Sequence, residues 1–170
     1  MSHEVFKEDR IFIISWGVFL GLMAFLVMGI LIAPLLKTLG VSGISRFLYG
    51  FYHLGCHQLD ERSWFICSAK LGVCVRCFAT YLFLIIAGAA FFIRPIREWI
   101  QRRWFLRLVL PLSLGLFFPL LVDGLFQLIT PWESTNLLRF ITGGLAGAGT
   151  ALLLGYLVLR FTQKVEASIR

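Results

Sequence analysis

Charged residues are scarce in this sequence. Only 15% of its 170 residues are Asp, Glu, Lys or Arg, whereas soluble domains carry about 25%. Hydrophobic residues make up 59%, and the mean hydropathy is +0.86. This composition excludes a disordered chain, which needs low hydrophobicity, and it argues against a soluble cytosolic enzyme. The length leaves room for one domain, so we expect a single membrane domain over residues 1–170.

Long apolar segments predict how often the chain crosses the membrane. A spanning helix needs about 20 mostly apolar residues. The first apolar run, Ile11–Ala33, is too long for the apolar core of a signal peptide. We therefore expect it to stay uncleaved as a helix that stops at Pro34 and Lys37. Ile44–Leu54 is too short to cross and is interpreted as interfacial or re-entrant. We predict an all-α, integral membrane four-helix bundle with a long extracytoplasmic first loop that contains a short interfacial helix, its spans at about residues 11–33, 72–93, 104–129 and 137–161.

The distribution of basic residues predicts the orientation. With four spans, ten Lys and Arg residues fall on the side of both termini: Lys7, Arg10, Arg94, Arg97, Arg102, Arg103, Arg107, Arg160, Lys164 and Arg170. Six fall on the opposite side: Lys37, Arg46, Arg62, Lys70, Arg76 and Arg139. The positive-inside rule then places both termini in the cytoplasm of a multi-pass protein of the cell inner (plasma) membrane. The net charge of +7 suits contact with the lipid bilayer, and nucleic-acid binding is not expected.

The four cysteines of the chain all lie in the Cys/His loop, residues 44–77. His53-x-x-Cys56 and Cys74-x-x-Cys77 have the spacing of a four-ligand zinc site, because two intervening residues let a turn direct both side chains at one ion. His57 is an equally good nitrogen ligand, and the spacing does not choose between the histidines. The loop therefore predicts a metal site, with zinc as the cofactor.

Other interpretations of these cysteines remain open. They are compatible with buried small residues or, in an oxidising compartment, with disulfides. A C-x-x-C pair at the outer end of a membrane helix also resembles membrane thiol oxidoreductases that use a quinone. Arg76 would lower the pKa of its neighbouring thiols, which favours redox chemistry and metal binding equally.

Polar residues inside the spans predict a pocket near this loop. Asp123 and Gln127 are four residues apart, hence on one helix face. Asn136, Arg139 and Thr142 follow each other at steps of three at the start of the last span. With four spans, both groups lie on the side of the cysteine loop. The alternative is that Asp123 and Arg139 only neutralise each other and lock two helices together.

Small residues in the last span predict close helix packing. Gly143-x-x-x-Gly147 and Ala151-x-x-x-Gly155 form a face that lets another helix approach. The pattern is common and carries no functional information.

The combined motifs resemble a family of small prokaryotic multi-pass membrane proteins of unknown function, marked by a CHQ…ERS…C-x-R-C signature. The matching residues are Cys56-His57-Gln58, Glu61-Arg62-Ser63, Cys74-x-Arg76-Cys77 with Tyr81, Asp123-Gly124-x-x-Gln127 and Ser134-x-Asn136-x-x-Arg139-x-x-Thr142-Gly143. The resemblance favours His57 over His53 and leaves Cys67 outside the signature. It implies a site formed by Cys56, His57, Gln58, Cys74, Cys77, Asp123, Gln127 and Arg139.

Two functions of different classes follow. The first is a metal-binding membrane protein, with a structural role as an accessory component beside other membrane subunits. Its zinc ligands would be Cys56, His57, Cys74 and Cys77, and its pocket would contain Gln58, Arg76, Asp123, Gln127, Asn136 and Arg139. The second is a thiol–disulfide oxidoreductase coupled to a quinone, using Cys74 and Cys77 with Cys56 as the resolving thiol. A transporter or channel is a weaker third, since four helices enclose only a thin pore.

Overall fold

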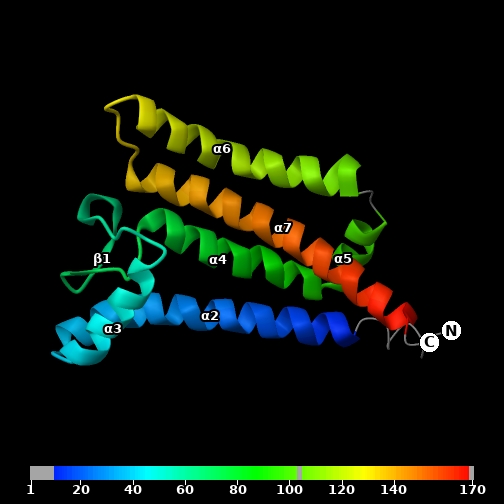
Figure 1. The fold of residues 1–170 in the computed structure, drawn as a ribbon, viewed down its shortest axis with the longest axis horizontal. Coiled ribbons are helices and arrows are strands. Elements are labelled where there is room, and N and C mark those ends of the chain that lie inside the picture. Colours follow the sequence, from blue (N-terminus) through cyan, green and yellow to red (C-terminus); the bar gives the residue numbers. More distant parts are fainter. Residues whose placement is uncertain (1–9, 103–104, 169–170) are drawn as a thin grey trace.

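The computed structural model describes residues 10–102 and 105–168. In this part of the chain, helices account for almost all regular structure, with one short β-hairpin (Figure 1). The elements are α2 (Arg10–Thr38), α3 (Ser42–His53), η1 (Asp60–Arg62), β1 (Phe65–Ile66), β2 (Ala69–Lys70), α4 (Val75–Ala89), η2 (Ala90–Phe92), α5 (Arg94–Gln101), the π-helix η3 (Phe105–Val109), α6 (Leu110–Ile129) and α7 (Asn136–Ser168). The predicted all-α class is confirmed.

Four helical segments are long and apolar enough to cross a membrane, as predicted. They are α2, α4 continued by η2, η3 continued by α6, and α7. Trp104, at which the third span was predicted to begin, lies outside the described residues, as do Lys7, Arg103 and Arg170 of the charge comparison.

Two helix ends differ from the predicted ends of the spans. Helix α2 continues through Pro34 to Thr38. A proline inside a helix leaves the carbonyl four residues earlier without its usual partner. Here that carbonyl, of Ile30, accepts a hydrogen bond from the Gly72 N–H at 3.3 Å, so the helix is tolerated. Helix α4 begins at Val75 rather than near residue 72, because Cys74 has an extended backbone.

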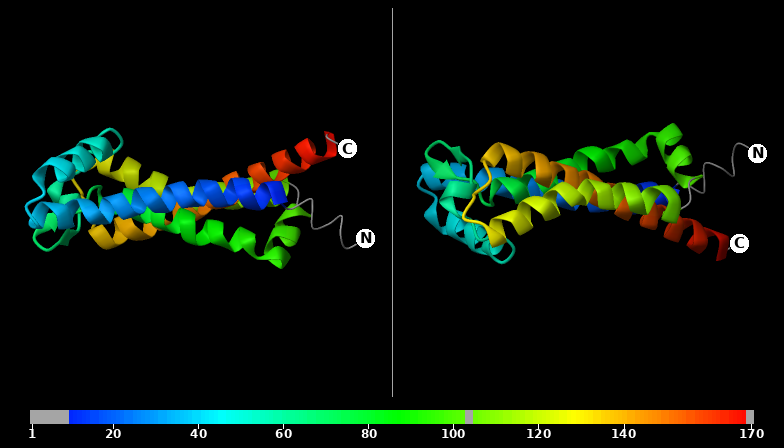
Figure 2. Two further views of the ribbon diagram at one scale, coloured as in Figure 1. Left: turned by 90° about the horizontal axis from the view of Figure 1, so that it is seen from below. Right: turned by 90° about the horizontal axis from the view of Figure 1, so that it is seen from above.

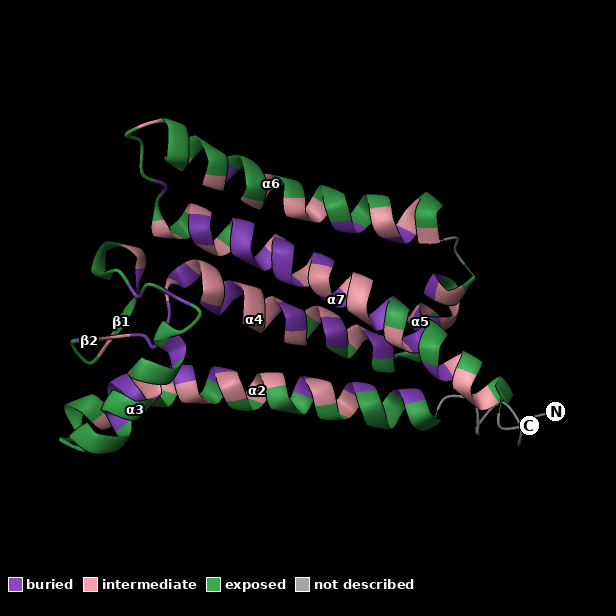
Figure 3. Cartoon of the chain, in the orientation of Figure 1, coloured by how far each residue is buried: buried purple, intermediate pink, exposed green. Residues whose placement is uncertain are grey.

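The four long helices lie side by side in a row, in the order α2, α4, α7, α6 (Figure 1). The views turned by 90° show that the row is flat (Figure 2). Helix α7 lies inside the row, and half of the residues in its most apolar 18-residue stretch are buried. In the span formed by η3 and α6, only 11% of the most apolar stretch is buried, because α6 forms one edge of the row (Figure 3). The exposed surface of α6 is rich in Leu and Phe, which suits contact with lipid.

Helices α4 and α7 pack closely because α7 has glycines at the contact. A Cβ atom at Gly143 would collide with the backbone carbonyl of Arg76, and one at Gly147 with that of Thr80. The Thr80 hydroxyl donates a hydrogen bond to the Gly143 carbonyl at 3.1 Å. The predicted small-residue face of the last span is therefore the one that meets α4.

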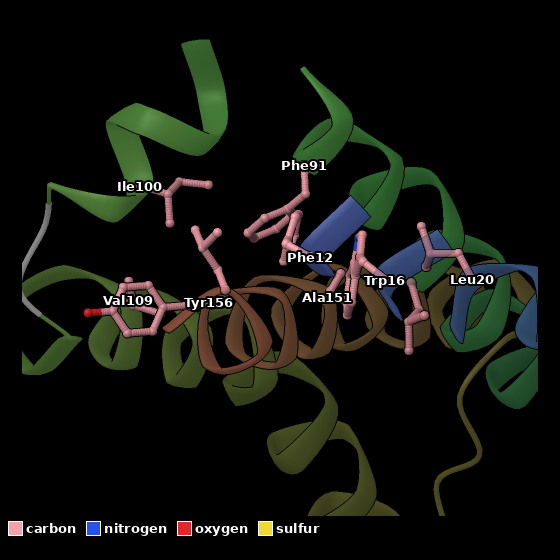
Figure 4. Close-up of a cluster of buried hydrophobic side chains, with 10 residues drawn as sticks. Phe12, Trp16, Leu20, Phe91, Ile100, Val109, Ala151 and Tyr156 are labelled. Atoms are coloured by element: carbon pink, nitrogen blue, oxygen red, sulfur yellow. The ribbon is translucent and has the colours of Figure 1, made fainter. Parts of the chain in front are cut away.

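The buried apolar side chains form two clusters. The cluster in Figure 4 lies toward α5 and includes Phe12, Trp16, Phe91 and Tyr156. The second lies at the other end of the row, which we call the cysteine end, and combines residues of α2, α3, α4 and the intervening loop: Val27, Ile30, Tyr52, Cys56, Leu71, Val73 and Phe78. The second cluster holds the loop against the ends of the long helices.

Helix α3 lies against α2 by its polar side chains. The Ser45 hydroxyl donates to the Ala33 carbonyl at 3.0 Å, and the Tyr52 hydroxyl to the Leu26 carbonyl at 2.7 Å. The opposite face is apolar and exposed, with Ile44, Phe47 and Phe51 at helical spacing. This amphipathic form is typical of the interfacial segment that the sequence predicts.

Candidate metal centre

Three of the four cysteines come together at the cysteine end. The sulfur atoms of Cys56, Cys74 and Cys77 all lie within 4.8 Å of one another. Cys56 follows α3, Cys74 is the N-cap of α4, and Cys77 lies in the first turn of α4. The backbone N–H of Cys74 donates a hydrogen bond to the Cys56 sulfur at 3.1 Å.

Cys67 lies apart from this cluster, at the tip of the β1–β2 hairpin. Ile66 pairs with Ala69, so Cys67 and Ser68 form a two-residue turn, and both have positive φ. Such a turn matches the twist of the two strands. The thiol of Cys67 is exposed, and all four cysteines are free thiols. The hairpin was not predicted from the sequence.

Gln58 fixes the segment that carries Cys56. Its side-chain N–H groups donate to the carbonyls of Tyr49 and Gly72, at 2.8 and 2.7 Å. Its backbone carbonyl accepts a hydrogen bond from the Lys70 ammonium group, and its backbone has the unusual φ of 52°. Because Gly72 lies two residues before Cys74, these bonds hold the segment with Cys56 next to the segment with Cys74 and Cys77. Gln58 was predicted as a pocket residue, and its polar atoms serve to hold the loop.

The three thiols share hydrogen bonds. Bonds from the side chains of Cys74 and Cys77, and from the Cys74 backbone, lower the pKa of Cys56. The bond to Cys56 raises the pKa of Cys74, because loss of the proton would remove the donor. The neighbouring thiols and burial therefore set the shift of the Cys74 pKa, and the predicted effect of Arg76 stays a prediction.

The two histidines lie in different places. His57 is exposed and lines the same cavity as the three cysteines. Within the described ranges, the tight group of ligand atoms consists of the three sulfurs and does not include His57. His53 is exposed at the last residue of α3.

The cluster opens into a cavity of about 230 Å³. Its walls include the three thiols, His57, Gln58 and three arginines, namely Arg62, Arg76 and Arg139. Three arginines therefore line the same cavity as the three sulfurs, and a cationic side chain beside a thiol favours its thiolate form.

Arg76 connects the cluster to the membrane-spanning part. Its guanidinium forms an ion pair with Asp123 of α6, whose side chain is only 4% exposed. Asp123 is therefore paired with Arg76, and the alternative in which Asp123 and Arg139 neutralise each other does not hold. Helical spacing shows which residues share a face, but not which helix lies opposite, and here α4 supplies the partner.

Arg139 belongs to a second ion-pair group at the rim of the cavity. It donates to the Asn136 side chain at 3.2 Å and to Glu133 at 3.4 Å. Glu133 also pairs with Arg62 at 3.0 Å, and these arginines lower its pKa, Arg62 foremost. Glu133 was missed in the sequence, although it is the acidic residue of the loop directly before the last span.

Gln127 completes this end of α6. Its side-chain amide donates to the Asp123 carbonyl at 3.0 Å and to the Ser134 hydroxyl at 2.9 Å. These bonds tie the loop between α6 and α7 back to α6. Gln127 and Asn136 were predicted in the pocket, but neither is among the residues that line the thiol cavity.

Comparison with known proteins agrees with this architecture. Residues 56–153, which contain the thiol cluster and Asp123, match the family model described as "Predicted membrane protein (DUF2085)". The chain is 38% identical over 135 residues to "Uncharacterized protein MJ1492" of Methanocaldococcus jannaschii, covering 74% of this chain and 82% of that relative. It is 34% identical over 98 residues to an "Uncharacterized protein" of Methanothermobacter thermautotrophicus, covering 58% of this chain and 82% of the relative. No solved structure matches. The chain belongs to the DUF2085 family of predicted membrane proteins.

Proposed function

We propose that this protein binds a zinc ion through the thiolates of Cys56, Cys74 and Cys77. The proximity of the three sulfurs, all within 4.8 Å, carries the proposal. Tetrahedral zinc with bonds of about 2.3 Å brings its sulfur ligands to roughly 3.8 Å from one another, so small side-chain shifts suffice. Soft thiolates prefer zinc over the harder magnesium and calcium ions.

The charges around the cavity support this assignment. Arg62, Arg76 and Arg139 line the cavity, and their ion pairs involve two carboxylates, Asp123 and Glu133. One positive charge of this group is left over. A divalent ion bound by three thiolates has one negative charge in total, so the loaded site would balance it. Asp123 and Arg139 are the buried members of this group, and buried charges are stable only when they are compensated.

His57 lines the same cavity as the three thiols and is our candidate for the fourth ligand. With His57 bound, the site is closed and structural, since four protein ligands leave no position for water. Its role is to lock the segment after α3 onto the first turn of α4. We favour this structural role.

Metal analysis of the purified protein tests the proposal. We expect about one zinc per chain in the wild type. Cys77→Ser should lower the affinity for zinc by more than the roughly 10–100-fold that the loss of a residue supporting a metal ligand costs. Cys67→Ser is the matched control, because Cys67 is an exposed cysteine outside the cluster, and it should retain the metal. Metal-free wild type with a Cys56–Cys74 or Cys74–Cys77 disulfide would overturn the proposal and favour the quinone-coupled oxidoreductase.

We also propose that the cysteine end faces the outside of the cell inner (plasma) membrane. Basic residues at the α5 end support this orientation, among them Arg94, Arg97 and Arg102. A membrane-impermeant maleimide added to intact cells should label Cys67. In a Cys67→Ser background, Arg102→Cys should react only after the cells are opened. The reverse pattern would overturn the orientation.

An accessory role beside other membrane subunits accompanies the structural site. It is supported by the single-helix-thick row, in which α6 contributes little to any core. Mild-detergent purification from the native membrane should yield a complex larger than the chain with its micelle. A particle of one chain only would contradict the accessory role and leave the metal proposal intact.

A further inference from the structure

A second cavity lies between α6 and α7. It has a volume of about 470 Å³ and is lined by apolar and aromatic side chains, including Phe118, Val122, Phe126 and Trp132. Phe118, Val122 and Phe126 repeat every four residues on α6 and are exposed on its surface. Because this surface belongs to a membrane-spanning helix, the cavity opens sideways toward the lipid.

One strongly polar group lies in this apolar cavity. Asp123 lines it, and its side chain is 4% exposed. Its Oδ2 atom pairs with Arg76, whereas its buried Oδ1 atom has no hydrogen-bond partner among the described residues. A buried carboxylate oxygen without a donor is costly, and the cost is larger in hydrocarbon than near water. An unsatisfied acceptor therefore lies in the wall of the cavity, buried behind its apolar lining.

We propose that this cavity binds a lipophilic molecule with a hydroxyl group, and that the hydroxyl donates a hydrogen bond to Asp123 Oδ1. The Asp123–Arg76 pair is already neutral overall, so a neutral donor fits better than an ammonium group. The apolar walls suit an alkyl or aromatic body, and the opening toward lipid admits a molecule dissolved in the bilayer.

The site is distinct from the metal centre but adjacent to it. Arg76 lines the thiol cavity, and its partner Asp123 lines the second cavity. The ion pair thus forms a wall common to both. The ligand site stands on Asp123 and the aromatic lining, so it does not depend on whether the thiols bind zinc.

Photolabelling in phosphatidylcholine nanodiscs tests the proposal, since this lipid has no hydrogen-bond donor. The probes are an alkylphenol with a diazirine in its tail, the methyl ether of that phenol, and a diazirine-bearing long-chain alkanol. We expect saturable labelling by hydroxyl probes in α6 near Val122 or in the adjoining part of α7. The ether should need at least about tenfold higher concentration, because a hydrogen bond to a charged acceptor is lost.

The outcomes separate cleanly. Stronger labelling by the phenol than by the alkanol identifies a ring-bearing ligand, and the reverse identifies an aliphatic lipid alcohol. Equal labelling by phenol and ether, or labelling spread over all helices, would overturn the proposal.

Val122→Trp should fill the cavity and lower labelling at least about fivefold. Leu121→Trp, which changes an exposed neighbour that does not line the cavity, should leave labelling unchanged. Unchanged labelling of Val122→Trp would also overturn it.

Discussion

Helices α4 and α6 lie on opposite sides of α7, and they contact it in different ways (Figure 1). Against α4, the glycines of α7 bring the backbones together, and the Thr80 hydroxyl bonds across the contact. Against α6, the contact is less extensive and leaves an apolar cavity. In α6 only Ser113 and Asp123 are buried, and each has a buried oxygen that finds no partner in the part of the chain that the structure describes.

The two helices are therefore held against α7 by different kinds of interaction. Lipid tails are as apolar as leucine side chains, so helices in a membrane associate through close packing and polar contacts. The α4–α7 pair uses close packing and fixes Cys74 and Cys77 in space. Helix α6 is held at the cysteine end by the Arg76–Asp123 pair and the Gln127 bonds, which leaves room for a ligand.

The largest effect should come from Arg76→Met, which strands the Asp123 carboxylate in an apolar environment. We expect a loss of about 3 kcal/mol in the free energy of unfolding, at the low end for a broken buried pair because Arg76 is partly exposed. Unfolding in mixed micelles with increasing SDS measures it. The double variant Arg76→Met/Asp123→Leu should recover much of the loss. A double variant as unstable as the sum of the two single variants would show that the pair does not hold α6.

A second effect contrasts two glycines. Gly143→Ala should cost about 2 kcal/mol, because its methyl group forces the α4 backbone away. Gly115 of α6 has open space around its Cβ position, so Gly115→Ala should be neutral or stabilise by up to about 1 kcal/mol through helix propensity. The same SDS titration compares them. Equal effects would mean that the contact of Gly143 with the α4 backbone does not limit how closely α4 and α7 approach.

A third effect contrasts two hydroxyls. Thr80→Val removes the bond to the Gly143 carbonyl and should cost about 1 kcal/mol. Ser113→Ala removes a buried hydroxyl that has no partner within residues 10–102 and 105–168, so it should leave stability unchanged or raise it. Thermal unfolding of both variants in one detergent is the measurement. A destabilised Ser113→Ala protein would reveal a polar contact in the α6–α7 interface.

The smallest effect concerns pH. The ion pairs of Glu133 with Arg62 and Arg139 lower its pKa, so their stabilisation is present above the unfolded-state value of about 4.3 and is lost as the pH falls through the lower folded value. Between about pH 6 and pH 3, Glu133→Gln should lose slightly less thermal stability than the wild type. Parallel curves for the two proteins would mean that these exposed pairs do not contribute.

The helices could be predicted because each depends on its own residues. A run of about 20 apolar residues satisfies its backbone internally as a helix, whatever lies beside it. The ends were less predictable: Pro34 stays helical only because Gly72, from a distant loop, bonds the Ile30 carbonyl. The hairpin around Cys67 escaped prediction because its turn has neither of the usual residues, Asn and Gly.

The sequence by itself determined the four apolar helices and the presence of paired cysteines in one loop, since hydropathy and spacing are local properties. Only the tertiary structure decided which groups meet: Cys56 with Cys74 and Cys77, Asp123 with Arg76 rather than Arg139, and Glu133 with two arginines. These partners are far apart in sequence, and their contacts depend on the order of the helices in the row, which the packing of glycines against backbone selects.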